Sequence, residues 1–246
     1  KFNVILISRS QTKLDIVAKE LESEFSEVKF RVIAFDFTAS TSYEYQPLFD
    51  ELYSYEIGVL VNNVGTMQCP EILHKVRGEK AELARISTIN TLPMLMLSSA
   101  VLEYMAPRKK GIIINITSGF ALSDAPLWNV YSASKNYAFH LSRTLRKEYS
   151  SYGITIQTLT PMRVFTKLLM PKMDKPSFFV PSAENYARSA LKTVGIVNET
   201  AGYCAHQLQI VFNRFLPSCL YRRIVNRSTR RIRTSIRNDL EGNVKA

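Results

Sequence analysis

The sequence predicts an α/β fold whose centre is a doubly wound parallel sheet. Short apolar runs rich in β-branched residues alternate with amphipathic segments of helical period along most of the chain. Repeated strand and helix units of this kind form a parallel sheet with helices on both faces. The chain has 246 residues, of which 46% are hydrophobic, and this favours one domain with a sizeable core.

Each strand and helix can be placed from its hydrophobic periodicity. In chain order we expect strand 4–7, helix 12–25, strand 30–35, helix 47–54, strand 57–61, helix 81–105, strand 111–117, a helix that contains Tyr131 and runs to about 151, strand 154–159, helix 183–194 and a short strand near Gly202. Pro93 should interrupt or bend the longest helix, because proline removes a backbone donor.

Tyr131 and Lys135 form the most informative candidate site. Residues four apart on a helix share one face. The helix follows strand 111–117, which leads to Ser118, and open α/β sheets bind ligands at the carboxyl ends of their strands. These groups could protonate a carbonyl while hydride arrives from a nicotinamide, so a carbonyl reductase is our leading hypothesis. The alternatives are a solvated helix face and a Ser that caps a turn.

Several motifs resemble those of the short-chain dehydrogenase/reductase family and occur in the family's order. They are Asn62-Asn63-Val64-Gly65, Asn90, Ser118, Tyr131 with Lys135, and the segment from Pro161 to Lys167. The match covers nearly the whole chain and implies a Rossmann-like fold. Segments 4–10, 60–65 and 189–195 and the late Gly202-Tyr203 resemble the 17-beta-hydroxysteroid dehydrogenase branch, type 12 and type 3. That resemblance implies a steroid ketone or a long-chain 3-oxoacyl-CoA as substrate, and a cytosol-facing location at the endoplasmic reticulum membrane.

The resemblance also implies a role for each catalytic candidate. Tyr131 would donate or accept the proton, Ser118 would hold the substrate carbonyl oxygen, and Lys135 would hydrogen-bond the nicotinamide ribose. Asn90 would kink its helix and help to order a proton-relay water. We expect the Lys135 ammonium to lower the pKa of Tyr131 from its usual value of about 10. Segments 120–128 and 170–180 would line the substrate pocket.

NADP(H) is the cofactor that the resemblance favours. Arg9 follows strand 4–7 where family members that prefer the phosphorylated nucleotide carry a basic residue, and a guanidinium can clamp a 2′-phosphate. Asp36 would meet the adenine, Asn62 the adenosine half, and Thr166 the nicotinamide carboxamide. Asp36 and Asn62 could instead be residues that form turns. Met162 stands where the family has Gly, which weakens the assignment of Thr166.

The family's glycine-rich phosphate-binding turn, and the strand before it, do not occur in residues 1–246. We therefore expect this sequence to be a fragment of a longer enzyme. In the family's sheet order the missing strand lies between strands 4–7 and 57–61, so these two strands should flank a gap. We expect the stretch alone to be poorly folded and inactive.

Charge is distributed unevenly along the chain. The formal net charge is +11, and arginines crowd an acid-free stretch from Arg222 to Arg237. We assign residues 1–221 to the family domain and 222–246 to a basic C-terminal tail. The tail could be a solvated helix or could contact anionic lipid, and nucleic acid ranks last because interleaved aromatic residues are absent. Three widely spaced cysteines indicate reduced thiols without a metal.

Two classes of function remain open. The first is an NADPH-dependent reductase, and the second is a catalytically idle family member that binds lipid or a membrane surface. Asn90, Ser118, Tyr131 and Lys135 are all present, which favours the reductase. The resemblance further implies a homodimer formed through the helices near Asn90 and Tyr131.

Overall fold

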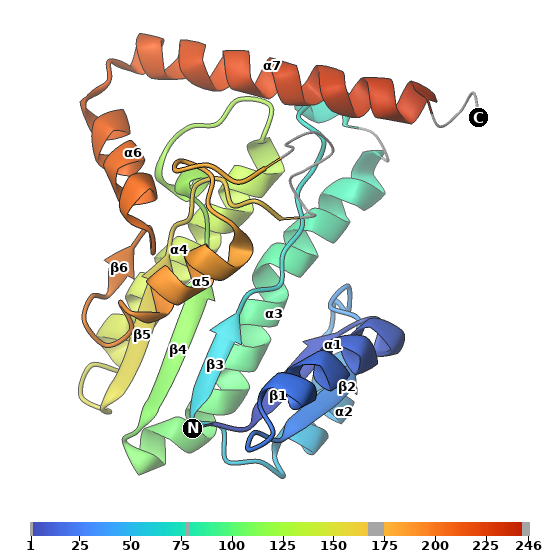
Figure 1. The fold of residues 1–246 in the computed structure, drawn as a ribbon, viewed down its shortest axis with the longest axis vertical. Coiled ribbons are helices and arrows are strands. Elements are labelled where there is room, and N and C mark those ends of the chain that lie inside the picture. The colour runs from blue at the N-terminus through green and yellow to red at the C-terminus, as the bar shows by residue number, and fades with distance from the viewer. Residues whose placement is uncertain (1, 77–78, 167–174, 243–246) are drawn as a thin grey trace. The chain divides into compact units, whose positions relative to one another are not determined.

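A computed structural model describes residues 2–76, 79–166 and 175–242. The chain divides into two compact units, Lys1–Glu56 and Ile57–Ala246, each of which is described by itself. Figure 1 follows the chain through both units. Every paired strand is parallel to its neighbour, so the predicted parallel α/β architecture is confirmed.

The first unit is a two-stranded sheet with two helices. Its elements are β1 (Val4–Ser8), α1 (Gln11–Glu24), β2 (Phe30–Ala34) and α2 (Ser42–Leu52). Strands β1 and β2 pair in parallel, with Val4 opposite Phe30 and Ser8 opposite Ala34. Because this register aligns their carboxyl ends, the residues that follow the two strands emerge at the same edge of the sheet.

Helix α2 begins five residues earlier than the periodicity predicts. Thr41 and Glu44 form a capping box, in which the Glu44 N–H donates to Thr41 Oγ1 at 3.4 Å and the Thr41 N–H donates to Glu44 Oε2 at 2.9 Å. Pro47 therefore lies inside the helix and does not start it. Our expectation of a helix at 47–54 was wrong at its start because we took the proline as the first helical residue.

The second unit holds a four-stranded sheet in the order β3-β4-β5-β6. Its elements in chain order are β3 (Val59–Asn62), the 3-10 turn η1 (Leu73–Lys75), α3 (Glu79–Arg108), β4 (Gly111–Ile116), the 3-10 turn η2 (Gly119–Leu122), α4 (Asn129–Glu148), β5 (Ile154–Leu159), α5 (Ala183–Leu191), β6 (Glu199–Thr200), α6 (Cys204–Phe215) and α7 (Ser218–Gly242). Among the described residues β1 and β3 each have a strand partner on one side only.

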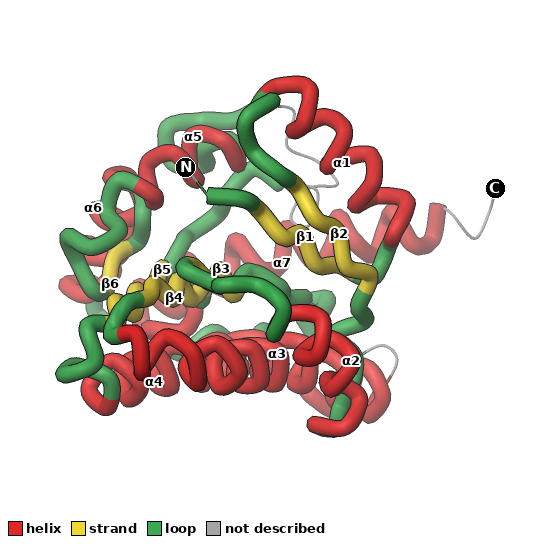
Figure 2. Tube along the Cα trace, turned by 90° about the horizontal axis from the view of Figure 1, so that it is seen from below, coloured by secondary structure: helices red, strands yellow, loops and turns green. Residues whose placement is uncertain are grey.

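Helices cover both faces of this four-stranded sheet. Figure 2 shows α3 and α4 along one face and α5 on the other. Successive side chains of β4 pack on opposite faces of the sheet, as expected for a strand that is buried on both faces. Ile113 packs with Val101, Leu102 and Met105 of α3. Ile114 packs with Tyr186 and Ala190 of α5.

Helix α3 runs without interruption through Pro93, so of our two alternatives the interruption does not occur, and the bend stays a prediction. Of the described helices, α3 is the one whose length and apolar composition would allow it to cross a membrane, over Lys80–Arg108. More than half of that apolar window, 56%, is buried inside the protein. This burial is typical of a core helix and makes the signal weak.

The arginine-rich stretch is part of a long helix within the second unit. Helix α7 begins at Ser218, passes through Arg222 and buries Val225 and Thr229, which are 8% and 2% exposed. Residues 222–242 therefore continue a packed helix, although the boundary that we drew at residue 221 stays a prediction about domains. The division between the two compact units falls at Glu56.

Candidate active site

The loop after β3 approaches two of the candidate residues closely. A Cβ atom placed on Gly65 would lie 3.0 Å from Lys135 Nζ and 3.2 Å from Asn90 Oδ1. Any larger residue would therefore push against both side chains. Glycine at this position lets the backbone after β3 lie directly against the helices that carry Asn90 and Lys135.

Asn90 joins three segments at this place. Its Oδ1 accepts from the Thr66 N–H at 2.8 Å, and its Nδ2 donates to Thr66 O and to Ser134 Oγ, each at 2.9 Å. Ser134 Oγ donates in turn to the backbone O of Tyr131 at 2.8 Å. The Asn90 side chain is 4% exposed, so it fixes the loop after β3 and the first turns of α4 relative to α3. The kink and the ordered water that we expected of Asn90 stay predictions.

The Ser118 hydroxyl lies close enough to the Tyr131 phenol to act on its pKa. Ser118 follows β4 as the N-cap of η2, and its Oγ accepts from the Phe120 N–H at 3.2 Å. Tyr131 lies in the first turn of α4, and its ring packs edge-on against Phe120 and Trp128, with centroid distances of 6.3 and 6.1 Å. A hydroxyl and a phenol thus converge beside an aromatic wall.

Burial raises the pKa of Tyr131, while the neighbouring Ser118 hydroxyl acts to lower it. The net direction is upward, opposite to the effect that we expected from Lys135. Desolvation dominates because an ionised phenol loses more hydration on burial than a neutral one. Tyr131 is therefore a protonated phenol at neutral pH in the protein alone, which suits a proton donor.

Lys135 is a buried cation one helical turn beyond Tyr131. It is 6% exposed, and its Nζ donates to the Ile116 backbone O at 3.2 Å. Burial lowers its pKa from 10.5 to about 8. An ammonium has three donors, so the group has capacity to bind further acceptors. Its Nζ lies between the end of β4, at the Ile116 carbonyl, and Gly65 in the loop after β3.

Gln68 contributes to this site, and the sequence analysis did not single it out. Its side chain is 2% exposed, its Oε1 accepts from the Tyr131 N–H at 3.3 Å, and its Nε2 donates to Leu127 O and Asn129 Oδ1 at 3.2 and 3.1 Å. Gln68 thus anchors the start of α4. No local pattern marks this glutamine, because its partners lie some sixty residues away in sequence.

Asn62 belongs to a buried polar network beneath the site. Its Nδ2 donates to Ser98 Oγ at 3.1 Å and to Asn115 Oδ1 at 2.7 Å, and Asn115 Nδ2 donates to Ser142 Oγ at 2.9 Å. The network crosses α3, β3, β4 and α4. Because Asn62 is 9% exposed and uses its amide in this network, its contact with a nucleotide stays a prediction.

The predicted nucleotide residues of the first unit, Arg9 and Asp36, follow β1 and β2 at the same edge of their sheet. Both are exposed. Asp36 Oδ1 accepts from the Thr38 N–H at 3.0 Å, which forms an Asx turn. This is the alternative that we left open for Asp36.

Thr166 follows the loop after β5. The Phe165 N–H just before it donates to Pro181 O at 2.8 Å, which closes the base of the segment that carries Thr166. Part of the predicted substrate segment, residues 170–174, lies outside the described residues, as does Lys167. Phe178 and Phe179 are described and are 61% and 53% exposed.

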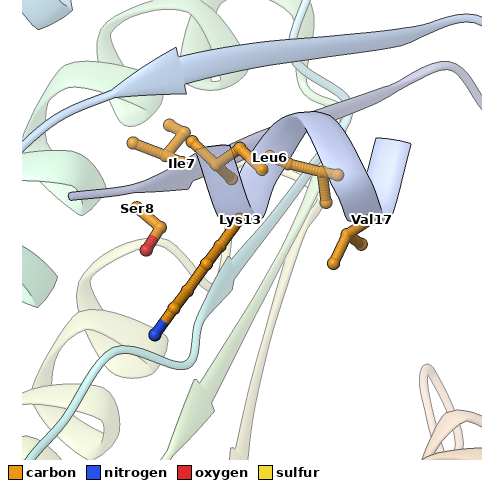
Figure 3. Close-up of a pocket in the computed structure, with 6 residues that line it drawn as sticks. Leu6, Ile7, Ser8, Lys13 and Val17 are labelled. Atoms are coloured by element: carbon orange, nitrogen blue, oxygen red, sulfur yellow. The ribbon is translucent and has the colours of Figure 1, made fainter. Parts of the chain in front are cut away.

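The first unit also has an open, mostly apolar hollow of about 230 Å³. It is lined by Leu6, Ile7, Ser8, Lys13, Leu14 and Val17. Figure 3 shows the Ser8 hydroxyl and the Lys13 side chain pointing to the same side. None of the candidate catalytic residues lines this hollow, so we do not take it as the site of chemistry.

The chain is similar to known proteins over most of its length. The family model described as short chain dehydrogenase matches residues 1–177. A very-long-chain 3-oxoacyl-CoA reductase of Caenorhabditis elegans is 45% identical over 225 residues, which cover 91% of this chain and 71% of that protein. The human very-long-chain 3-oxoacyl-CoA reductase is 39% identical over 231 residues, covering 92% and 72%.

Other relatives carry a different substrate in their names. A Caenorhabditis elegans protein named provisionally as steroid dehydrogenase 1 is 38% identical over 236 residues, covering 96% of this chain and 74% of that protein. Among solved structures, a 7beta-hydroxysteroid dehydrogenase aligns with a TM-score of 0.78 at 16% identity, covering 91% of this chain and 86% of that one. A short-chain dehydrogenase from Sphingobium yanoikuyae in complex with NADPH aligns with a TM-score of 0.68 at 24% identity, covering 78% and 74%. At these identities the two solved structures support the fold alone.

Proposed function

The chain belongs to the short-chain dehydrogenase family and is an oxidoreductase of that family, and from this premise we propose that it reduces the carbonyl of a long-chain 3-oxoacyl-CoA or a steroid ketone with NADPH. The observation that carries the proposal is the meeting of Ser118 and Tyr131 beside the buried Lys135. A phenol beside a hydroxyl, one helical turn from a buried cation, is suited to transfer a proton to a carbonyl oxygen.

In this proposal each side chain has one task. Ser118 holds the substrate carbonyl oxygen and stabilises the negative charge that develops there during reduction. Tyr131, kept protonated by burial, donates its proton to the same oxygen. Lys135 donates to the ribose hydroxyls of the nucleotide through the donors that Ile116 does not use. NADPH, when bound, supplies the hydride for the carbonyl carbon.

The residues of this chain suit such a nucleotide. A buried ammonium with spare donors lies beside Gly65, where the backbone approaches without a side chain. Arg9, exposed after β1, would pair with the 2′-phosphate, and Asp36 would contact the adenine from the neighbouring strand end. Asn62 would lie beside the adenosine half, and Thr166 would hydrogen-bond the carboxamide.

An apolar substrate is supported by the aromatic side chains that surround the phenol. Phe120 and Trp128 flank Tyr131, and their rings lie 5.6 Å apart. Phe178 and Phe179 add exposed aromatic surface in the predicted substrate segment. The two most similar relatives described above act, by name, on very-long-chain 3-oxoacyl-CoA, and this favours the acyl thioester over the steroid.

NADPH oxidation by the full-length protein tests the proposal, with a long-chain 3-oxoacyl-CoA in one arm and a steroid ketone in the other. We expect turnover in the acyl-CoA arm, and we expect Tyr131→Phe to lower kcat about a hundredfold or more, because general acid catalysis contributes on this scale. Equal turnover by both proteins would exclude Tyr131 as the donor. Binding of the lipid without NADPH oxidation would favour the catalytically idle alternative.

We further propose that the protein contacts a membrane, with the endoplasmic reticulum as the location that the family resemblance implies. The outer side of α6 supports this, because Leu208, Val211, Phe212 and Phe215 are 57%, 43%, 63% and 83% exposed. These residues follow helical spacing and share one side. Exposed arginines, Arg222, Arg223, Arg227 and Arg230, follow on α7. Apolar side chains next to cations are typical of helices that lie in a membrane interface.

Pairing of two copies through α3 and α4 is also proposed. These helices carry exposed apolar side chains at Leu95, Tyr104 and Tyr137, which are 38%, 40% and 39% exposed. An isologous dimer would cover them with the same surface of a second copy.

A further inference from the structure

His206 is a fully buried histidine whose two ring nitrogens both bind backbone. It lies in the first turn of α6 and is 0% exposed. Nδ1 accepts from the Met162 N–H at 3.3 Å, and Nε2 lies 3.0 Å from the backbone O of Arg163. Because Nδ1 accepts, the ring proton of the neutral histidine must be on Nε2, which then donates to Arg163.

The backbone that His206 holds leads directly to the proposed site. Met162 and Arg163 follow β5 and precede Thr166. The Met162 side chain lies against Gly119, where a Cβ would collide with its sulfur atom, and the Gly119 N–H donates to Pro161 O at 2.8 Å. Gly119 is the neighbour of Ser118. The position of the Met162 backbone therefore affects both the loop with Thr166 and the turn with Ser118.

The Phe179 backbone also lies close enough to the His206 ring to act on its pKa. One ring thus lies near both ends of the stretch between Met162 and Phe179, beside the second tie from Phe165 to Pro181. The ring itself is held by Tyr186 of α5 and Tyr203, with centroid distances of 5.7 and 5.4 Å. These contacts fix its orientation.

We propose that neutral His206 is a positioning residue that holds the backbone after β5 in the conformation that binds the nicotinamide end of NADPH. This inference rests on the proposed function, because it assigns a task to His206 within that site. Met162 stands where the family has glycine, and this difference explains why the backbone here needs a residue that holds it. A bulky residue restricts this backbone, and a rigid acceptor for its N–H compensates by fixing one conformation.

Protonation of His206 would break its hydrogen bond with the Met162 N–H. A proton on Nδ1 would face the Met162 N–H, so two donors would oppose each other. Burial lowers the pKa of His206 from 6.5, which favours the neutral form. The other titratable or charged groups beside the ring are Tyr186, Tyr203 and Arg163.

Two substitutions test the proposal through NADPH affinity, measured by the fluorescence of bound NADPH, and through KM and kcat. His206→Leu keeps an apolar side chain in the pocket and removes both hydrogen bonds. We expect it to weaken NADPH binding and raise the KM for NADPH roughly tenfold, with a smaller change in kcat. His206→Gln retains a donor and an acceptor, and we expect it to recover most of the affinity.

Tyr186→Phe is the matched control. It keeps the ring that packs on His206 and removes a hydroxyl that has no hydrogen-bond partner among the described residues, so NADPH affinity should not change. In the wild type, the KM for NADPH should also rise as the pH falls through the folded pKa of His206, which burial holds below 6.5, and this rise should be absent in His206→Gln.

Different results would contradict the role of His206 and the proposed reaction. If the wild type oxidises NADPH with substrate but His206→Leu binds NADPH as tightly as the wild type, the role of His206 is overturned. If His206→Leu does not fold, the pH dependence decides, and identical profiles for the wild type and His206→Gln overturn it. Weakened NADPH binding in His206→Leu, with no turnover by the wild type on either substrate, supports the positioning role and contradicts the proposed reaction.

Discussion

At the scale of single residues, Lys135 places function and stability in opposition. Burying an ammonium costs free energy unless it is paired with a charge, and among the described residues Lys135 has a carbonyl, that of Ile116, as its hydrogen-bond partner. A pKa lowered from 10.5 to about 8 corresponds to roughly 3 kcal/mol of destabilisation at neutral pH. Such a residue is typical of an active site, where the environment serves a ligand and not the fold.

Lys135→Met should therefore stabilise the protein while abolishing reduction. We expect the free energy of unfolding at pH 7 to rise by about 2 kcal/mol, because the desolvation cost disappears and one hydrogen bond is lost. Urea unfolding measures this change. Lys147→Met, at an exposed position of the same helix, is the control and should leave both stability and activity near wild type.

The pH dependence of the free energy of unfolding shows whether the buried charge of Lys135 destabilises the folded protein. The folded pKa of Lys135 is lowered, so between about 8 and 10.5 the unfolded chain binds more protons than the folded one. Wild-type stability should rise across this window relative to Lys135→Met, and the two curves should cross within it, because the wild type regains roughly 3 kcal/mol and keeps its hydrogen bond with Ile116. A Lys135→Met protein that is less stable than wild type at pH 7 would show that the ammonium is held by attraction, which our account excludes.

That the candidate catalytic residues lie near one another could be predicted from sequence, but the residues that hold them could not. Ser118, Tyr131 and Lys135 stand at positions where a strand end and a helix face bring them together. Gln68 and His206 act through backbone groups far away in sequence. A single glutamine or a buried histidine has no local pattern, because its role depends on which distant backbone groups the fold brings beside it.

At the scale of elements, caps decide where helices begin. The hydrogen bonds of Glu44 with Thr41 and Ser40 lower its pKa, and the contribution of this carboxylate is present above its unfolded pKa of 4.5 and lost as the pH falls through the lower folded value. The pair satisfies donors at the start of α2 that no helical carbonyl can reach.

Thr41→Ala should destabilise the first unit by about 1 kcal/mol, because the N-cap side chain no longer accepts from Glu44. Chemical unfolding followed by the circular dichroism of the helices measures the loss. Thr41→Ser retains the hydroxyl and should stay within a few tenths of a kcal/mol of wild type. Equal loss in both variants would mean that packing of the Thr41 methyl, and not the cap, starts the helix.

Most strands were predictable because buried parallel strands are continuous apolar runs. β4 and β5 lie where the periodicity placed them. Element ends were less predictable. The last strand is only Glu199–Thr200, paired with Thr158 and Leu159, and ends before Gly202. Nothing in its own sequence fixes this end, because the length of an edge strand depends on the strand beside it.

At the scale of the whole molecule, the sheet is divided where we expected a missing strand, because β1 and β3 belong to separate sheets. We expected one domain, and the compact units meet in sequence at Glu56. The strands are divided in the same way, into β1-β2 and β3-β4-β5-β6. The family, the parallel sheet and the order of the strands followed from short motifs, whereas this division depends on which strand edges are paired.

The C-terminal helices connect the site to the surface of the second unit. Trp128, which packs on Tyr131, donates from Nε1 to Thr229 Oγ1 of α7 at 3.0 Å. Ser123 hydrogen-bonds Tyr221, and Arg233 forms an ion pair with Glu71. These partners share the inner side of α7. Residues 120–128, which we predicted to line the substrate pocket, are therefore packed beneath a helix that also carries exposed arginines.

If this surface contacts a membrane, the full-length protein should bind vesicles of phosphatidylserine and phosphatidylcholine more tightly than vesicles of phosphatidylcholine alone, as measured by flotation. Any further anchor in the full-length protein is common to all variants. Arg223→Glu combined with Arg227→Glu should remove this preference, because each basic residue contributes about 1 kcal/mol near an anionic surface. Phe212→Ser combined with Phe215→Ser should weaken binding to both vesicles through loss of apolar burial.

Tyr43→Ser, which removes an aromatic ring that is 86% exposed in the first unit, is the control and should bind as wild type does. Unchanged binding by the Phe212 and Phe215 variant would assign the exposed side of α6 to another partner, and unchanged lipid preference in the arginine variant would remove α7 from the contact.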